Sequence, residues 1–313
     1  TYIHTRSGAR LKAETTAVMA TQLAEQLEDQ AGLLEAKLQT ALLTSFDGRL
    51  RDAEEQLAEL IEKYTWALQN TEQVTVPNPN FDYAAMLGLL QPIHPAMGLG
   101  IAQLERSRVL RRSSELDAAN ALLQAAARSF SEAGIVWGIG HTCLEAAHVL
   151  LDLGYTEDAQ QFLTQAFAHF KQTDPPMGLM QTKLHYACLL TRMGSLEKAS
   201  NKLQRLLKPL SVSAAGPDLA WCQIMLAINL GRQRKTAEAD TWFARGIDTA
   251  RQFGDRSTLM DSIIEHGLFL VREGRRHDAF LALRESLKLA REYQDTNSSG
   301  KLQRLLGDLS VAL

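Results

Sequence analysis

Three side chains that bind metals or protons lie on one face of a predicted helix in the middle of the chain. His141, Glu145 and His148 stand at i, i+4 and i+7, and His185 follows on the next predicted helix of the same kind. Imidazole and carboxylate groups clustered in this way are ligands that zinc accepts. The metalloprotease pattern, with two histidines four apart and a glutamate directly after the first, is absent. We therefore interpret the cluster as a polar wall of a binding groove, with a metal site as the alternative.

A set of arginines recurs at one position of a repeating pattern. The set consists of Arg112, Arg192, Arg232 and Arg272, and Asp152 interrupts it. Guanidinium groups bind the carboxylates or phosphates of a partner. Cations in the last turn of a helix also stabilise it through its dipole, by about 0.3–1 kcal/mol each, and this needs no ligand. We favour the dipole explanation and keep anion binding as the alternative.

Motifs of catalysis or cofactor binding are missing. Gly134, Gly138 and Gly140 fit neither the dinucleotide fingerprint nor the P-loop spacing, and no predicted strand precedes them. No serine stands in a nucleophile-elbow context, and no cysteine has a basic neighbour in sequence. We expect no enzymatic activity, no cofactor and no bound metal.

The composition excludes several classes of partner. The 313 residues include 33 Lys and Arg against 36 Asp and Glu, a formal net charge of −3. Phosphate binding needs a basic surplus, so we expect no direct nucleic-acid partner. No run approaches the roughly 18 apolar residues of a membrane span and no signal peptide is visible, so we expect no membrane partner. The three cysteines are widely spaced and form no disulfide pattern, which indicates a reducing, cytoplasmic compartment.

A regular internal repeat governs the chain. A leucine column consists of Leu110, Leu150, Leu190, Leu230 and Leu270. Small residues stand three positions earlier, at Ser107, Ala147, Ala187, Ala227 and Gly267. An alanine column follows, at Ala119, Ala159, Ala199, Ala239 and Ala279. Five copies in constant phase indicate an all-α array of repeats, because each copy buries its apolar stripe only against its neighbours.

Each repeat reads as two helices joined by a turn. The turn has glycine at Gly154, Gly194 and Gly274, which suits a chain that leaves a helix through a left-handed residue. Arg234 takes this position in one copy, and Gly231 stands three residues earlier. We expect a slightly reshaped turn there, with the flanking helices in phase.

The repeat divides the chain into four parts. Residues 1–69 hold a partial first repeat and one full repeat, and 98–294 hold the five repeats that the columns define. Between them, 70–97 contains half of the eight prolines and reads as an insertion, with one short helical piece around 81–90. We expect 295–313 to be a linker and a C-terminal capping helix.

The order of columns resembles the tetratricopeptide repeat (TPR). Gly154 to Ala159 and Gly194 to Ala199 are similar to its central turn and the start of its second helix. The usual repeat has 34 residues, whereas the leucine column of this chain recurs every 40 residues. This longer unit, with the linkers Phe130 to Gly134 and Gln252 to Asp255, resembles the repeat arms of MalT-like bacterial regulators and related signalling ATPases. The resemblance implies an α-α superhelix, a right-handed solenoid of antiparallel helix pairs.

The sequence departs from the family pattern in one column. A tryptophan is frequent in the first helix of such repeats, and Cys143 and Lys183 stand in its place. The family assignment therefore depends on the turn and on the small-residue columns. The chain begins at Thr1 within a repeat, just before a second helix. We expect it to be a piece of a longer, multidomain regulatory or signalling protein.

The resemblance implies a concave groove lined by the first helices of the repeats. The expected lining residues are Arg108, Arg112, His141, Glu145, His148, Asp152, Gln181, His185, Arg192, Trp221, Met225, Arg232, Glu265 and Arg272. A groove that is polar at one end and apolar at the other suits a peptide or protein segment with one hydrophobic anchor. The alternative for these residues is an ordinary solvated helix face. For the chain, the alternatives are a sensor arm for a small regulatory molecule or signal peptide, and a constitutive scaffold subunit.

Overall fold

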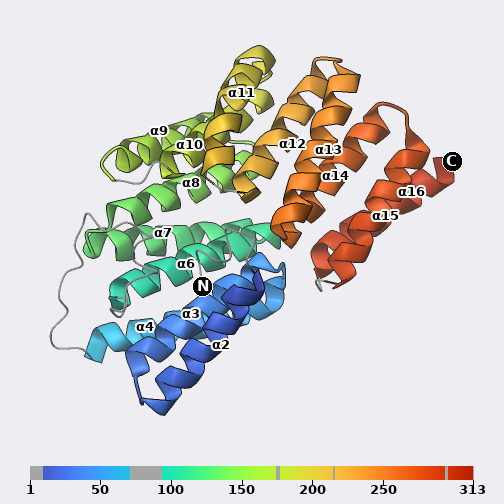
Figure 1. The fold of residues 1–313 in the computed structure, drawn as a ribbon. Coiled ribbons are helices and arrows are strands. Elements are labelled where there is room, and N and C mark those ends of the chain that lie inside the picture. Colours follow the sequence, from blue (N-terminus) through green and yellow to red (C-terminus); the bar gives the residue numbers. More distant parts are fainter. Residues whose placement is uncertain (1–9, 71–93, 174–176, 214–215, 293–294, 313) are drawn as a thin grey trace. The chain divides into compact units, whose positions relative to one another are not determined.

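Every described element of the chain is a helix. The computed structural model describes residues 10–70, 94–173, 177–213, 216–292 and 295–312, in which no strand occurs, so the all-α prediction is confirmed (Figure 1). The helices are α2 (Arg10–Gln26), α3 (Gln30–Phe46), α4 (Leu50–Asn70), α6 (Pro95–Arg112), α7 (Leu116–Glu132), α8 (Val136–Leu153), α9 (Thr156–Phe170), α10 (Met177–Arg192), α11 (Leu196–Val212), α12 (Gly216–Arg232), α13 (Thr236–Phe253), α14 (Arg256–Arg272), α15 (Arg276–Glu292) and α16 (Thr296–Ala312).

The chain divides into two compact units, which we describe separately. Unit 1 contains Ala9–Ser45 and Asp52–Leu189, and unit 2 contains Phe46–Arg51 and Leu190–Leu313. In unit 1, α6 packs against α7, α8 against α9, and α6 against α8. In unit 2, α12 packs against α13, α14 against α15, and α12 against α14. Each unit therefore stacks helix pairs so that first helices lie beside first helices.

The predicted insertion falls largely outside the described residues. The expected helical piece around 81–90 lies there, and the division into domains stays a prediction. The helix α6 begins at Pro95, whose fixed φ and missing N–H suit the first position of a helix. The Nδ1 atom of His94 caps this helix by accepting a hydrogen bond from the N–H of Ala96 at 3.2 Å.

One hydrogen bond is common to the five turns between first and second helices. The carbonyl of each leucine in the leucine column accepts from the backbone N–H five residues later, at 2.8–3.0 Å. The residue before each donor has a positive φ: Ser114 (67°), Gly154 (89°), Gly194 (78°), Arg234 (64°) and Gly274 (74°). This bond and the left-handed residue are the features by which a Schellman motif ends a helix. The first helix therefore ends in the same way, and at the same position, in each of the five repeats.

The expectation of a reshaped turn at Arg234 is wrong. Arg234 itself takes the left-handed conformation, and the N–H of Lys235 donates to the carbonyl of Leu230 at 3.0 Å, as in the other copies. A side chain in this conformation costs about 1–2 kcal/mol. The closing hydrogen bond and the packing of both helices outweigh that cost.

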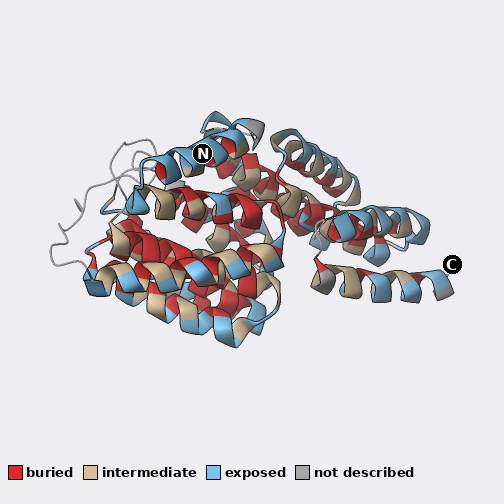
Figure 2. Cartoon of the chain, turned by 90° about the horizontal axis from the view of Figure 1, so that it is seen from below, coloured by how far each residue is buried: buried red, intermediate tan, exposed pale blue. Residues whose placement is uncertain are grey.

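Small side chains allow the helices of each unit to approach closely. Ser107, the alanines of the small-residue column and all five members of the alanine column have no exposed surface. Figure 2 shows buried residues along one side of the helices and exposed residues along the other. The sequence columns thus correspond to the buried stripes that hold the repeats together.

Aromatic residues near the ends of second helices pack onto glycines. A Cβ atom on Gly100 of α6 or on Gly138 of α8 would overlap the ring of Phe130. The same arrangement recurs in the next repeat with Phe170, Gly140 and Gly178. Each ring therefore lies between the first helix of its own pair and that of the next pair.

Crossing a membrane requires a helix that is both long and apolar. Within the described residues, no helix combines these two properties.

Candidate functional site

A polar cluster from three first helices surrounds Glu145 in unit 1. The Glu145 carboxylate, 5% exposed, lies on α8 between two arginines of α6. The Nε atom of Arg111 donates to it at 2.5 Å, and the Nε atom of Arg108 donates at 3.3 Å. The Nη1 atom of Arg111 also donates a hydrogen bond to the Asp152 carboxylate at 3.1 Å. The arginines of α6 therefore link two turns of the neighbouring helix.

Charge compensation keeps Glu145 ionised. Burial alone would raise the pKa of its carboxyl, but the charge of Arg111 and the proximity of His148 outweigh burial and hold the pKa well below its ordinary value of 4.5. For Arg111, burial would lower the pKa, and the Glu145 carboxylate reverses the effect and raises it. Glu145 and Arg111 are therefore both charged at neutral pH.

Two histidines extend the cluster to α10. The Nε2 atom of His148 and the Nδ1 atom of His185 lie 2.7 Å apart, and the ring planes cross at 87°. One of the two nitrogens must carry the proton that joins them. Burial lowers the pKa of His185 well below 6.5, and the charge of His148 lowers it further. His148 also places its Nδ1 atom 3.5 Å from the Glu145 carboxylate.

The register of the repeat predicts Arg112 in the groove, whereas the structure places its neighbour Arg111 in the cluster. Arg112 points the other way, and its Nη1 atom donates to the carbonyl of Ser45 at 3.5 Å. Arg111 occupies a column in which the other repeats have leucine, threonine, glycine and valine. A single charge in an otherwise uncharged column is the signal that would have revealed it.

Two further predicted residues of unit 1, His141 and Gln181, offer little open surface. His141 is half-buried, and its ring meets the edge of the Phe170 ring with centroids 4.9 Å apart. Gln181 is 8% exposed. Both side chains therefore contribute more to packing between the helices than to an open surface.

The predicted residues of unit 2 are two apolar side chains, three arginines and one glutamate. Met225 is 7% exposed and Trp221 is half-buried, both on α12. Arg192, Arg232 and Arg272 are exposed at the ends of α10, α12 and α14. Glu265 is half-buried on α14, two helical turns before Arg272.

Some arginines of the predicted set cap helices. The Nη1 atom of Arg232 donates at 2.8 Å to the carbonyl of Thr191, the last residue but one of α10. Arg112 reaches the equivalent carbonyl of α3, that of Ser45, and the Nε atom of Arg272 donates to Leu268 within α14 at 3.2 Å. Cations at helix C-termini satisfy free carbonyls and complement the dipole. These contacts agree with the explanation that we favoured from the sequence.

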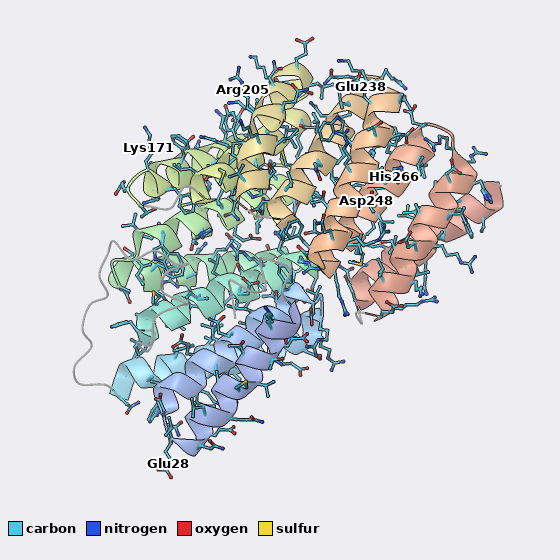
Figure 3. The ribbon with its side chains drawn as sticks, viewed as in Figure 1. Glu28, Lys171, Arg205, Glu238, Asp248 and His266 are labelled. Carbon is cyan, nitrogen blue, oxygen red and sulfur yellow. The ribbon has the colours of Figure 1, made fainter. Side chains whose placement is uncertain are left out.

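His266 forms a separate cluster in unit 2 (it is labelled in Figure 3). Its ring lies 5.0 Å from that of Phe243, and its Nε2 atom lies 3.7 Å from Asp240. Arg275 binds the same carboxylate through Nη1 at 2.7 and 2.9 Å. His266 therefore packs against an aromatic ring and beside a carboxylate that already has a cationic partner.

A cavity of about 370 Å³ lies between α2, α3 and α4 of unit 1. Its walls are Val18, Thr21, Gln22, Lys37, Thr40, Gln56, Glu59 and Leu60. The Oε1 atom of Gln56 is buried and has no hydrogen-bond partner within the described chain. Neither this cavity nor any other part of the described chain gathers three or more His, Cys, Asp or Glu side chains in an arrangement that could hold a metal ion.

The helix pairs, their identical turns and their small-residue columns define a TPR-like solenoid. Comparisons with solved structures agree. The NprR protein in complex with its cognate peptide NprX has a TM-score of 0.60 at 14% identity, covering 96% of this chain and 81% of that one. A Rap protein complexed with Competence and Sporulation Factor has a TM-score of 0.54 at 14% identity, covering 99% and 96%.

A third similar structure carries a repeat of this kind as a sensor. It is a protein from Pyrococcus horikoshii, described as a Signal Transduction ATPase with Numerous Domains, which has a tetratricopeptide repeat sensor. Its TM-score is 0.53 at 12% identity, over 99% of this chain and 43% of that one. No protein-family model and no curated protein matches the sequence. At these identities the similarity shows the fold, and the resemblance to TPR proteins is confirmed at that level.

Proposed function

We propose that this chain is a non-catalytic binding module that takes a peptide or protein segment on the face formed by its first helices. The observation that carries the proposal is the cluster around Glu145. It gathers charged and imidazole side chains from α6, α8 and α10 at distances of 2.5–3.5 Å. A surface preorganised in this way binds with little loss of side-chain freedom.

The similar structures support the same kind of ligand. NprR was solved with a cognate peptide, and the Rap protein with Competence and Sporulation Factor. Both share the helical-repeat fold of this chain. A peptide segment is therefore the first ligand class to test.

The test is a selection of peptides from a random displayed library, followed by binding measurements with labelled peptides. His148→Gln on α8 and Trp221→Phe on α12 change the first-helix face, and Gln160→Ala changes an exposed residue of the second helix α9. We expect at least one first-helix variant to weaken binding about tenfold. The α9 variant should bind like the parent. A loss that follows only the α9 variant, or a library that yields no binder, would contradict the proposal.

A small regulatory ligand is the second candidate. The cavity between α2, α3 and α4 favours it, because about 370 Å³ lies within the range of small-molecule sites. Thermal stabilisation of the chain by a panel of metabolites, abolished by Gln56→Leu, would support this candidate. No stabilisation by any metabolite would remove it.

A further inference from the structure

The exposed arginines of unit 2 lie close to one another. The guanidinium of Arg232 reaches the carbonyl of Thr191 at 2.8 Å, which places it beside Arg192 at the end of α10. The first helices α12 and α14 are packed together, and Arg272 ends α14 at the position equivalent to Arg232. The three cations are therefore presented in a row by successive first helices.

Arg232 and Arg272 of this row differ from the arginines of unit 1. Arg108 and Arg111 are each bound to carboxylates at 2.5–3.3 Å. Arg232 and Arg272 have no ion-pair partner within the described chain, and their hydrogen bonds there go to backbone carbonyls. A guanidinium has five donor hydrogens, so one carbonyl leaves most of its donors available.

Glu265 is a half-buried carboxyl group on α14, on which all three arginines of the row act electrostatically. The charges of Arg272, Arg232 and Arg192 all act on it and favour its ionised form. Burial acts more strongly in the opposite direction and, with the charge of Asp261, raises the pKa of Glu265 above 4.5. Glu265 is thus one carboxylate under the influence of three cations, and burial opposes its ionised form more than the row favours it.

We propose that the row formed by Arg192, Arg232 and Arg272 binds the carboxylates of an acidic peptide segment. This inference rests on the function proposed above and names the chemistry of the partner. Guanidinium groups bind carboxylates in a planar, two-pronged geometry and are used in clusters to recognise acidic motifs. Neighbouring packed helices lie about 8–10 Å apart. An extended peptide advances about 10 Å in three residues, so acidic residues three positions apart match the row.

Glu265 acts in this site as an internal competitor. A bound carboxylate has the same charge as ionised Glu265, so binding favours the protonated form of Glu265. Glu265→Gln should therefore strengthen binding of an acidic peptide at neutral pH, because it removes the competing charge.

The experiment uses the same displayed library on the full chain and on two triple variants. The site variant is Arg192→Gln/Arg232→Gln/Arg272→Gln. The control is Arg205→Gln/Arg245→Gln/Arg284→Gln, which removes one exposed arginine from each of the second helices α11, α13 and α15 (Arg205 is labelled in Figure 3). Thermal melting shows first that both variants are folded.

We expect the parent and the control to enrich peptides with Asp or Glu three positions apart, and the site variant to lose this enrichment. Binding of an enriched peptide should weaken at least tenfold in the site variant. If the library yields binders without acidic enrichment, or if both triple variants lose them equally, this inference is wrong and the peptide-binding function stands. If no peptide binds the parent, both fall.

Discussion

Glu145 is a buried carboxylate that two arginines of another helix and a histidine of its own helix hold in the ionised form. Replacing it with Gln leaves Arg111 without its closest counter-charge. We expect Glu145→Gln to lower the free energy of unfolding by about 2 kcal/mol, less than for a fully buried pair because the Arg111 side chain is 24% exposed. Denaturant unfolding measures this effect. Glu157→Gln, at an exposed position of α9, is the matched control and should change stability little.

The pKa shifts around this cluster predict loss of stability in acid. The pKa of His185 is lowered in the folded state, so the unfolded chain binds the proton more tightly and stability falls as the pH drops below about 6.5. The lowered pKa of Glu145 adds a second loss below about 4.5. Melting temperatures measured across this range should fall on acidification. His185→Gln should flatten the part between about pH 6.5 and 5, and an unchanged slope in that variant would contradict the assignment.

At the scale of single residues, the sequence predicted only part of the site. The positions of His148, His185 and Glu145 on adjacent first helices followed from the register of the repeat, and the structure brings them together. The role of Arg111 did not follow from the register, because its direction depends on how far α6 and α8 turn about each other. Side-chain direction depends on packing angles that a one-dimensional pattern does not contain.

At the scale of the elements, the left-handed turn residue is the feature most open to test. Arg234 has a φ of 64° where three other copies have glycine. Arg234→Gly should raise the free energy of unfolding by about 0.5–1 kcal/mol, because relief of the left-handed side chain exceeds the added entropy of the unfolded chain. Gly194→Ala should lower stability by a similar amount. Melting temperatures that shift in the same direction in the two variants would contradict the identity of the turns.

The rings that lie between first helices give a second element-scale prediction. A Cβ atom on Gly138 would overlap the ring of Phe130, so Gly138→Ala should destabilise the chain by about 1–3 kcal/mol. Adding Phe130→Leu should recover part of this loss, because the smaller side chain makes room for the methyl group. Gly307→Ala in α16, where a Cβ atom meets nothing within 4 Å, is the control and should not destabilise.

The elements were also the part of the fold that the sequence predicted best. The turns and the buried small-residue columns depend on local chemistry, and the residues responsible recur in most repeats of the sequence. The turn at Arg234 was the exception. Glycine propensity alone predicted a change there, whereas the hydrogen bond to Leu230 and the packing of α12 on α13 fix the same turn.

At the scale of the whole chain, the two units present first-helix faces of different charge. In unit 1 the arginines of α6 are bound to carboxylates of the same unit. In unit 2 the exposed Arg232 and Arg272 donate hydrogen bonds to backbone carbonyls. A repeat scaffold permits this difference, because the buried columns fix the fold and leave the first-helix surface free to vary.

The claim that most needs testing is that the first helices form the binding face. Hydrogen–deuterium exchange of the full chain, with and without a peptide selected from the library, tests it directly. We predict slower exchange on binding in α6, α8, α10, α12 or α14, with α7, α9, α11, α13 and α15 unchanged. Protection confined to the second helices would contradict the account.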